Sequence, residues 1–429
     1  MKGLRASSRH FPKNWELVAV GEITSDWKGG APLKPEDFTD DGFPILHKGA
    51  IQRGGKISID EKKKTCTTTE YAQAHPRSVV DRSYMAVTLR DLVPAGPSIG
   101  LIANLANCPS SRYLLAQGAY GFHVDKDRVD PSYLVHLSNY ELFRGYLKRY
   151  CVGSTQIHIR TPVFQAVEIP LPPLLEQRSI AAVLDKADAL RDKRRQAITK
   201  LDTLLQSVFL DMFGDPVTNP KSWPETTIGN IADYVSSGVT PLGGSSTYLD
   251  KGILFIRSQN VLMNDFDLSD AAYLSEEAHH TMKRTWVKNG DVLINITGAS
   301  IGRVHFYQGE DDSANVNQHV CIIRPNNKDQ VTPQFLSYFL STPSYQARIL
   351  SQNSGATRQA FNFQQIRSFK IFLPPQKAQL QFAGVCDRLG RASTRMFTSS
   401  LKIERLKNSL EQFGFSGNLF KEHAILNVT

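Results

Sequence analysis

The sequence predicts an α+β protein built as a tandem duplication, in which each copy is a globular module followed by one long helix. Two observations predict this fold class. An internal repeat keeps a constant offset of 202 residues across most of each copy, as from Gly96 to Gly298, and a long amphipathic stretch closes each copy. A constant offset of this kind indicates a duplicated structural unit.

Short motifs recur in register at this offset, and near the start of each copy the offset is 208, as from Trp15 to Trp223. The two copies therefore share one frame. The recurring motifs are Gly96-Pro97-Ser98-Ile99-Gly100 with Gly298-Ala299-Ser300-Ile301-Gly302, Gly153-x-Thr155 with Gly355-x-Thr357, and Leu171-Pro172-Pro173 with Leu373-Pro374-Pro375.

Each globular module is predicted to mix strands with short helices. A helix is expected over residues 131–150, with its copy over 333–350, because each stretch opens with proline and carries spaced Leu, Phe and Tyr. Strands and helices do not alternate regularly, which argues against a doubly wound sheet. Strands are predicted where β-branched and aromatic residues lie between turn-formers, at residues 43–46, 84–89, 253–257, 291–297, 303–307 and 319–324.

The two long stretches are predicted to be helices that pair with each other. The first runs from Glu176 to about Met212 and contains neither glycine nor proline. Apolar residues repeat along it at heptad spacing, and the second stretch, over residues 379–413, repeats the pattern. At 1.5 Å per residue each helix would be about 55 Å long, which favours a coiled-coil pair over two separate core helices. The residues alone leave the orientation of the pair open.

Composition indicates an intracellular protein, and its basic charge fits either a polyanionic partner or a merely basic soluble protein. The net charge is +9 and the pI is near 9.2. The excess lies in residues 1–173, with 22 basic and 17 acidic residues, and in 374–413, with 7 and 3, whereas 214–373 has 13 and 14. The five scattered cysteines indicate neither a disulfide framework nor a zinc site. No secretory signal or membrane span is visible, so we expect a cytoplasmic protein.

The loops of the second copy are rich in side chains that read base edges in DNA. Arginine pairs with guanine, asparagine and glutamine with adenine, and serine or threonine with either. Because such residues also cluster in ordinary turns, each one alone is a weak signal, and the prediction rests on the set. The predicted DNA-binding residues of this copy are Arg257, Gln259, Asn260, Thr297, Ser300, Arg303, Asn317, Gln318, Thr357, Arg358 and Gln359.

The loops of the first copy keep the frame and change the side chains. Two modules that share a frame but differ in their contact residues would read two different sequences. We therefore expect an asymmetric, two-part DNA target. The predicted DNA-binding residues of this copy are Lys48, Gln52, Arg53, Thr88, Arg90, Ser98, Thr155, Gln156 and His158.

Enzyme motifs are present only in weak form. Gly96-x-Ser98-x-Gly100 and Gly298-x-Ser300-x-Gly302 match the nucleophile elbow of serine hydrolases, which requires a helix directly after the serine. A strand-like stretch follows Gly302 instead, and Pro97 disturbs the turn in the other copy. The sequence has no phosphate-binding glycine loop and no dinucleotide loop, and its histidines lack metal-ligand spacing. We predict no catalytic residue and no metal site in this chain.

Taken in order, the motifs resemble the specificity subunits of type I restriction-modification systems. The resemblance covers nearly the whole chain. It rests on the two-copy plan, the helix entry Leu171-Pro172-Pro173-Leu174-Leu175-Glu176-Gln177 with its copy Leu373-Pro374-Pro375, the loop over residues 297–304, and the Phe-Gly ends of both helices. It implies two mixed α/β target-recognition domains separated by two long helices that form an antiparallel coiled coil.

The domains implied by this resemblance follow the repeat. In the family, each recognition domain reads one half of a split DNA site and the helices set the distance between the halves. The expected domains are target-recognition domain 1 at 12–173, a spacer helix at 174–213, target-recognition domain 2 at 214–373, a second spacer helix at 374–413, and a C-terminal tail at 414–429.

The resemblance also implies partners and cofactors. We expect double-stranded DNA, two methyltransferase (modification) subunits and restriction/translocase subunits as partners, and no membrane. S-adenosylmethionine, ATP and Mg²⁺ are expected in the partner subunits, and no cofactor in this chain. Two other interpretations stay open on the residues alone: a duplicated protein-interaction scaffold without DNA binding, and a serine hydrolase at the Gly-x-Ser-x-Gly repeats.

Overall fold

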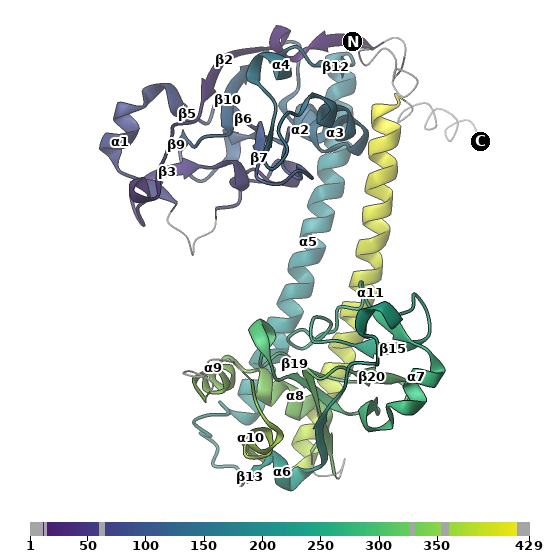
Figure 1. Ribbon diagram of the computed structural model, residues 1–429. Helices are drawn as coiled ribbons and strands as arrows, with labels where there is room; N and C mark the ends of the chain where they lie inside the picture. The colour runs from purple at the N-terminus through teal and green to yellow at the C-terminus, as the bar shows by residue number, and fades with distance from the viewer. Residues whose placement is uncertain (1–11, 13–14, 60–64, 327–330, 353–359, 418–429) are drawn as a thin grey trace, which may run out of the picture. The chain divides into compact units, whose positions relative to one another are not determined.

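The computed structural model describes residues 12, 15–59, 65–326, 331–352 and 360–417 (Figure 1). The chain divides into two compact units. Unit 1 comprises Met1–Arg195 together with Ser399–Thr429, and unit 2 comprises Gln196–Thr398. Two helices of 40 residues each, α5 (Leu174–Phe213) and α11 (Gln376–Phe415), contribute one part to each unit.

The described residues of unit 1 form two four-stranded sheets and two strand pairs. Its strands are β1 (Glu16–Ala19), β2 (Thr24–Gly29), β3 (Phe43–Leu46), β4 (Cys66–Thr67), β5 (Val79–Asp81), β6 (Met85–Thr88), β7 (Arg90–Asp91), β8 (Ile102–Asn104), β9 (Arg112–Leu115), β10 (Ala119–Val124), β11 (Ile157–His158) and β12 (Glu168–Leu171). The sheets have the orders β2-β10-β6-β8 and β4-β3-β9-β5, and the pairs are β1-β12 and β7-β11. The shorter helices are α1 (Thr69–Ala74), α2 (Pro131–Asn139), α3 (Glu141–Leu147) and α4 (Thr161–Gln165).

Unit 2 contains two four-stranded sheets and one strand pair. Its strands are β13 (Glu225–Thr227), β14 (Ala232–Ser237), β15 (Ile253–Ile256), β16 (Ala272–Leu274), β17 (Trp286–Val287), β18 (Val292–Asn295), β19 (Val304–Phe306), β20 (Ala314–Val316), β21 (Val320–Pro325) and β22 (Lys370–Phe372). The sheets have the orders β14-β21-β18-β19 and β16-β15-β20-β17, and the pair is β13-β22. The shorter helices are α6 (Ile228–Ile231), α7 (Glu276–Thr281), α8 (Pro333–Ser341), α9 (Pro343–Gln352) and α10 (Phe363–Arg367).

The two units have the same strand order. The first sheet of each unit is antiparallel throughout, and the second contains one parallel pair, β3 with β9 in unit 1 and β15 with β20 in unit 2. A shared order that includes the single parallel pair is what a duplicated module would produce. The predicted α+β class and the tandem plan are confirmed.

The two helices pack antiparallel within each unit, as the family resemblance implied. In unit 1 the Lys407 ammonium of α11 lies 2.7 Å from the Asp188 carboxylate of α5. In unit 2 the Phe382 ring of α11 meets the Phe209 ring of α5, with centroids 5.4 Å apart. The early part of each helix therefore meets the late part of the other. The apolar stripe is less continuous than predicted, because Leu190 and Leu204 are 57% and 46% exposed.

A buried glutamine anchors the start of each long helix. Gln177 and Gln379 are both 0% exposed. The Gln177 amide donates to the Pro172 carbonyl at 2.8 Å, and the Gln379 amide donates to the Pro374 carbonyl at 2.9 Å. Each amide oxygen also accepts a backbone N–H from the residue before α2 or α8. The same side chain therefore ties helix to module in both copies.

The single helices predicted at 131–150 and 333–350 are each broken once, so that prediction was wrong. Tyr140 separates α2 from α3, and Thr342 separates α8 from α9; both residues are extended, with ψ of 122° and 143°. Thr342 precedes Pro343, and proline disfavours a helical conformation in the residue before it. Tyr140 instead stacks on Phe415 of α11, with ring centroids 4.7 Å apart.

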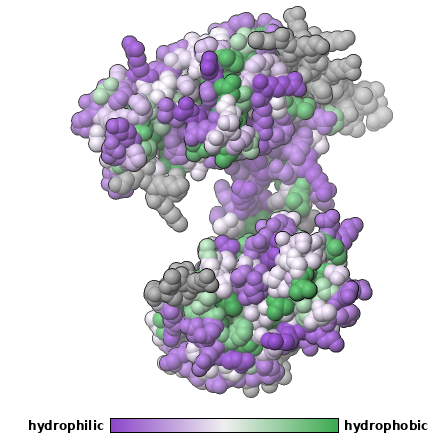
Figure 2. Space-filling view, in the orientation of Figure 1, coloured by the Kyte–Doolittle hydropathy of each residue, from purple (hydrophilic) through white to green (hydrophobic). Residues whose placement is uncertain are grey.

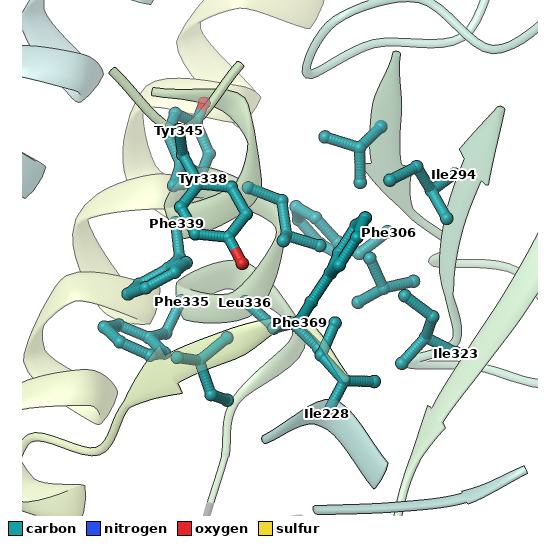
Figure 3. Close-up of a cluster of buried hydrophobic side chains, with 14 of the residues drawn as sticks. Ile228, Ile294, Phe306, Ile323, Phe335, Leu336, Tyr338, Phe339, Tyr345 and Phe369 are labelled. Atoms are coloured by element: carbon teal, nitrogen blue, oxygen red, sulfur yellow. The ribbon is translucent and has the colours of Figure 1, made fainter. Parts of the chain in front are cut away.

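The largest core of unit 2 joins its antiparallel sheet to α8 and the long helices. Phe335 and Phe339 of α8 are fully buried, and Ile294 and Ile323 extend from the sheet toward them (Figure 3). The corresponding core of unit 1 is built the same way from Tyr133 of α2 and the sheet β2-β10-β6-β8. The modules are therefore rigid supports for the loops at the ends of their strands.

Candidate nucleic-acid interface

In unit 1, several loops that carry predicted DNA-binding residues converge. The Thr88 hydroxyl, at the end of β6, donates to the Lys48 carbonyl in the turn after β3 at 3.1 Å. Arg90 of β7 pairs with His158 of β11. The β9-β10 turn joins them through Gly118, where φ is +96° and a Cβ would lie 3.1 Å from Arg90 Cβ and 3.2 Å from Lys48 Cδ. The positive φ favours glycine at this position, and the neighbouring side chains leave little room for a Cβ.

This convergence gives unit 1 a compact cationic site. Burial, and then the neighbouring Arg90 guanidinium, lower the pKa of Lys48, while the Asp91 carboxylate opposes that shift. Burial acts to raise the pKa of Asp91, but hydrogen bonds from the Ser98 hydroxyl and N–H outweigh it and lower that pKa. Asp91 therefore stays ionised beside the two cations. Lys48 and Arg90 offer donors that suit phosphate oxygens or the guanine edge.

Unit 2 repeats the convergence with other side chains. The Asn295 amide, at the end of β18, donates to the Ser258 carbonyl after β15 at 2.7 Å. Thr297 pairs with Ala360, and the Thr297 hydroxyl lies 2.6 Å from Nδ1 of His319 in the β20-β21 turn. Most of these contacts lie at positions equivalent to those of unit 1, while the side-chain contact between Thr297 and His319 occurs in unit 2. The correspondence is Lys48 to Ser258, Thr88 to Asn295, Arg90 to Thr297, Gly118 to His319 and His158 to Ala360.

The site of unit 2 is polar where that of unit 1 is cationic. Gln318 is exposed, accepts a hydrogen bond from the Thr240 hydroxyl, and places its Nε2 3.1 Å from His319 Nε2. Beside it, after β15, Arg257 pairs with the Asp270 carboxylate at 2.5 Å, and the Gln259 amide donates to that same carboxylate at 2.8 Å. The two units therefore present different chemistry from equivalent places.

Three of the predicted residues are buried, and two of them, Asn260 and Asn317, bond to the backbone of their own loops. Thr88 is 0%, Asn260 2% and Asn317 9% exposed. The Asn260 side chain accepts the Arg257 N–H at 3.0 Å, and that of Asn317 accepts the His319 N–H at 3.1 Å. The two asparagines fix the shape of their loops, because short polar groups bonded to nearby backbone stabilise turns. Direct base contact by these three stays a prediction.

The remaining predicted DNA-binding residues that the structure describes differ in their contacts and in their exposure. Arg53 pairs with Glu141 of α3 at 2.5 Å, and the Gln52 amide donates to the Gly49 carbonyl at 2.6 Å. Their role in binding DNA stays a prediction. Thr155 and Gln156 are exposed before β11, and Ser300 and Arg303 are half-buried before β19. Thr357, Arg358 and Gln359 lie outside the residues that the structure describes.

The hydrolase motif is not a nucleophile elbow in either unit, so that interpretation was wrong. The Ser98 hydroxyl donates to the Asp91 carboxylate at 2.6 Å. Ser300 closes a short turn, and the strand β19 follows it where an elbow needs a helix.

Two absences hold for the part of the chain that the structure describes. No group of three or more His, Cys, Asp or Glu side chains there could hold a metal ion. None of the helices within that part is long and apolar enough to span a bilayer.

No pattern in the sequence indicated the acidic residues that organise these loops. Asp91 and Asp270 each receive hydrogen bonds from a predicted contact residue, Ser98 and Arg257 respectively. Asp270 stands thirteen positions after Arg257 in the chain, so only the folded loop brings them together. The anchors Gln177 and Gln379 did carry a signal, since they follow the Leu-Pro-Pro motifs at the constant offset of 202.

Hydrophilic side chains cover much of the visible surface of each unit (Figure 2). A duplicated module that keeps its strand order and places different polar side chains at equivalent positions has the organisation of a two-module recognition protein.

Comparison with known proteins agrees with this class. The type I restriction modification DNA specificity domain matches the chain twice, at residues 12–200 and 220–405. The EcoBI specificity subunit of Escherichia coli is 25% identical over 325 residues, covering 69% of this chain and 65% of that protein. The EcoKI specificity subunit of E. coli K12 is 22% identical over 444 residues, covering 96% and 91%.

A solved structure shares the fold. The S subunit of a type I restriction-modification system from M. genitalium superposes with a TM-score of 0.56 at 15% identity, covering 94% of this chain and 96% of that one. The chain belongs to the type I restriction modification DNA specificity family and carries two copies of its domain.

Proposed function

We propose that this chain is the non-catalytic DNA-recognition subunit of a type I restriction-modification complex, and that its two units read the two halves of an asymmetric DNA site. The observation that most supports the proposal is the shared frame with unlike side chains. Lys48 and Arg90 of unit 1 occupy the places of Ser258 and Thr297 in unit 2. Cationic donors favour guanine, whereas hydroxyl groups accept or donate, so the halves should differ in sequence.

The proposed partners are double-stranded DNA, two methyltransferase subunits and restriction/translocase subunits. The methyltransferase subunits would hold S-adenosylmethionine, and the translocase subunits ATP and Mg²⁺. The names of the EcoBI and EcoKI relatives, each a specificity subunit of a type I restriction enzyme, support this assignment. The complex would act in the cytoplasm, where these partners meet the chromosome.

The test is co-expression of the full chain with the methyltransferase subunit encoded beside it, followed by mapping of methylated adenines over the host genome. We expect a motif of two unlike half-sites separated by a fixed gap, present only when both proteins are expressed. Methylation that is absent, or that has the same motif without this chain, would contradict the proposal.

A further inference from the structure

The Asp270 carboxylate ties together two candidate contact residues of unit 2. Nη2 of Arg257 donates to Asp270 Oδ1 at 2.5 Å and also to the Asp270 backbone carbonyl. Nε2 of Gln259 donates to the other carboxylate oxygen at 2.8 Å. Hydrogen bonds to a charged group are roughly twice as strong as neutral ones. One carboxylate therefore fixes a guanidinium and an amide at the same time.

The surroundings hold this arrangement in place. The Arg257 side chain is only 19% exposed, and its guanidinium lies 5.7 Å from the centre of the Tyr248 ring. The buried Asn260 closes the loop by accepting the Arg257 N–H at 3.0 Å and donating to the Asp267 carbonyl at 2.9 Å. Asp270 itself is 65% exposed. The Asp270 carboxylate therefore lies at the surface, while the Arg257 side chain that it orients is mostly buried and packs beside Tyr248.

The contacts determine which hydrogen-bonding groups remain for a ligand. An amide whose Nε2 faces a carboxylate must turn its oxygen away, because two oxygens would repel each other. Gln259 is exposed and therefore keeps Oε1 as an acceptor. Arg257 uses Nη2 to donate to Asp270, which leaves Nη1 as a donor for a ligand. The pair thus offers one acceptor and one donor group in a fixed order.

We propose that Asp270 is a specificity-determining positioning residue of unit 2, which orients Gln259 and Arg257 to read a base that carries an amino donor beside an acceptor. In the major groove adenine alone combines these on one base, as the N6 amino group and N7. Guanine and thymine lack the amino donor there, and cytosine lacks N7. This inference rests on the proposed function, since it names a base class for one half-site.

The test uses the full chain co-expressed with the methyltransferase subunit, and the readout is the motif of methylated adenines. In Asp270→Ala neither Arg257 nor Gln259 is held, so we expect the unit 2 half-site to lose its preference for adenine at one position by roughly tenfold. In Asp270→Asn one oxygen still accepts from Arg257, but the Gln259 amide loses its partner. That variant should relax the same position less. The unit 1 half-site and the gap should stay unchanged in both.

Asp233→Asn, at an exposed carboxylate on β14 of the same unit, is the charge-matched control and should keep the wild-type motif. A wild-type two-part motif that Asp270→Ala leaves unaltered would overturn the inference while sparing the proposed function. Loss of methylation at every site in both Asp270 variants, with a lowered melting temperature, would also overturn it, because Asp270 would then be a folding residue. A wild-type chain without any motif would instead contradict the proposed function.

Discussion

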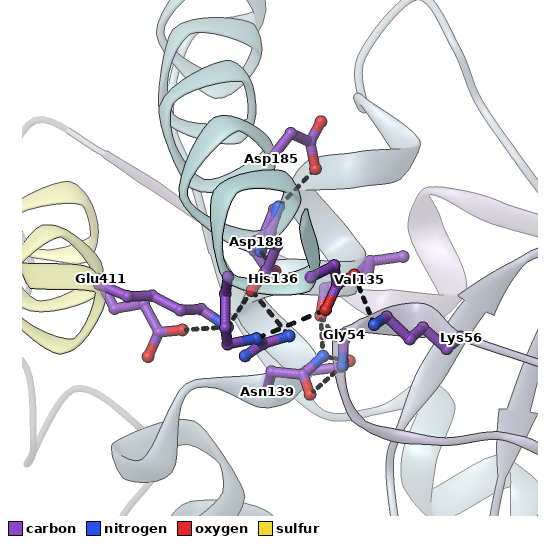
Figure 4. Close-up of polar contacts among 12 residues, drawn as sticks. Gly54, Lys56, Val135, His136, Asn139, Asp185, Asp188 and Glu411 are labelled. Atoms are coloured by element: carbon purple, nitrogen blue, oxygen red, sulfur yellow. Dashed lines mark hydrogen bonds and ion pairs between the residues drawn. The ribbon is translucent and has the colours of Figure 1, made fainter. Parts of the chain in front are cut away.

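Equivalent positions on the helix pair carry opposite chemistry in the two units. In unit 1, charged side chains join α5 to α11, and a polar contact joins α5 to α2. Lys407 is 9% exposed and lies 2.7 Å from Asp188 and 3.5 Å from Glu411, and the His136 ring of α2 lies 2.8 Å from Asp185 (Figure 4). In unit 2 the same offset of 202 places apolar or small residues at four of these positions, whereas Asp185 is matched by another carboxylate, Asp387. The counterparts of His136, Asp188, Lys407 and Glu411 are Tyr338, Gly390, Leu205 and Phe209.

The packing differs accordingly. Phe209 and Phe213 of α5 contact Phe335 and Phe382 with ring centroids 5.0 to 5.6 Å apart, which is the geometry of favourable aromatic pairs. Beside this cluster, unit 2 keeps an open cavity of about 730 Å³, lined in part by Leu205, Tyr338 and Gly390.

The corresponding place in unit 1 is occupied by charged side chains. Arg191 lies 3.1 Å from Asp188, and Lys56 lies 2.5 Å from Asp192 of α5. Arg191 therefore faces acidic residues of its own unit. The same fold therefore accommodates two kinds of contact between α5 and α11. We call the ring cluster around Phe209 in unit 2 the aromatic joint and the contacts of Lys407 in unit 1 the charged joint. Charged groups that must pair restrict which helix surfaces fit each other, so the two halves of each long helix should not be interchangeable.

We expect the largest effect when the aromatic joint of unit 2 is disrupted. Phe209→Ala removes a ring that is 0% exposed and contacts three other rings. We expect it to lower the unfolding free energy of unit 2 by roughly 3–5 kcal/mol. Urea unfolding, with hydrogen exchange of peptides from each unit, measures this. Leu204→Ala, on the same helix but 46% exposed, should cost under about 1 kcal/mol, and equal costs would refute the joint.

The charged joint should respond differently to the same kind of change. Lys407→Leu installs the unit 2 residue and leaves Asp188 and Glu411 without their shared cation, so we expect a loss of roughly 3 kcal/mol in unit 1. Adding Glu411→Phe, the other unit 2 residue, should recover part of it, with a coupling on the order of 1–2 kcal/mol. Additive costs in the double variant would show that the charges are independent.

The buried glutamines at the start of α5 and α11 are a feature that the two units share, so their removal should affect both units alike. Gln177→Ala and Gln379→Ala each remove the partner of a buried carbonyl and of a backbone N–H, which is partly buried at Asp130 and buried at Thr332. Each should lower the stability of its own unit by roughly 1–3 kcal/mol, and by similar amounts. Hydrogen exchange in α2 and α8 gives the two values separately. A large cost in one unit alone would contradict the shared anchor.

The smallest expected effect is an opposite pH response of the two units. Burial lowers the pKa of His305 in unit 2 to about 4, so the unfolded state binds a proton first. Unit 2 should lose stability as the pH falls from about 6.5 to 4. Burial raises the pKa of Glu411 in unit 1, although Lys407 opposes it. Its folded state binds the proton more readily, so this carboxyl contributes stability at low pH that is lost as the pH rises through its raised pKa.

His305→Phe and Glu411→Gln isolate these contributions. Between pH 7 and 4.5, the wild type should lose more stability in unit 2 than His305→Phe does, by on the order of 1 kcal/mol. Over the same interval Glu411→Gln should lack the gain that the wild type shows in unit 1. Identical pH profiles for wild type and variant would contradict the assignment of either group.

Much of this fold could be predicted because it repeats. The constant offset revealed the duplication, and heptad spacing with flanking prolines and glycines placed both long helices to within a few residues. The break at Tyr140 could not be predicted, because spaced apolar residues fit one helix or two, and only its stacking on Phe415 separates them. The charged joint was hidden for the same reason, since Lys407 and Asp188 are far apart in the chain.

The site divides in the same way. Sequence analysis identified Lys48, Arg90 and Thr297, which lie near the ends of corresponding strands in the two units. It also selected Asn260, whose side chain turns inward to hold its loop, because residue type does not reveal which way a loop side chain points. It missed Asp270, which acts only through residues that folding brings to it.

The most direct measurement of the central claim exchanges contact residues between the modules while keeping the frame. Lys48→Ser with Arg90→Thr gives unit 1 the side chains of Ser258 and Thr297 in unit 2. The variant and the wild type, each co-expressed with the methyltransferase subunit, are compared by mapping methylated adenines. We predict that one half-site changes while the other half-site and the gap stay the same. A change in both halves, or in neither, would contradict the assignment of one half-site to each unit.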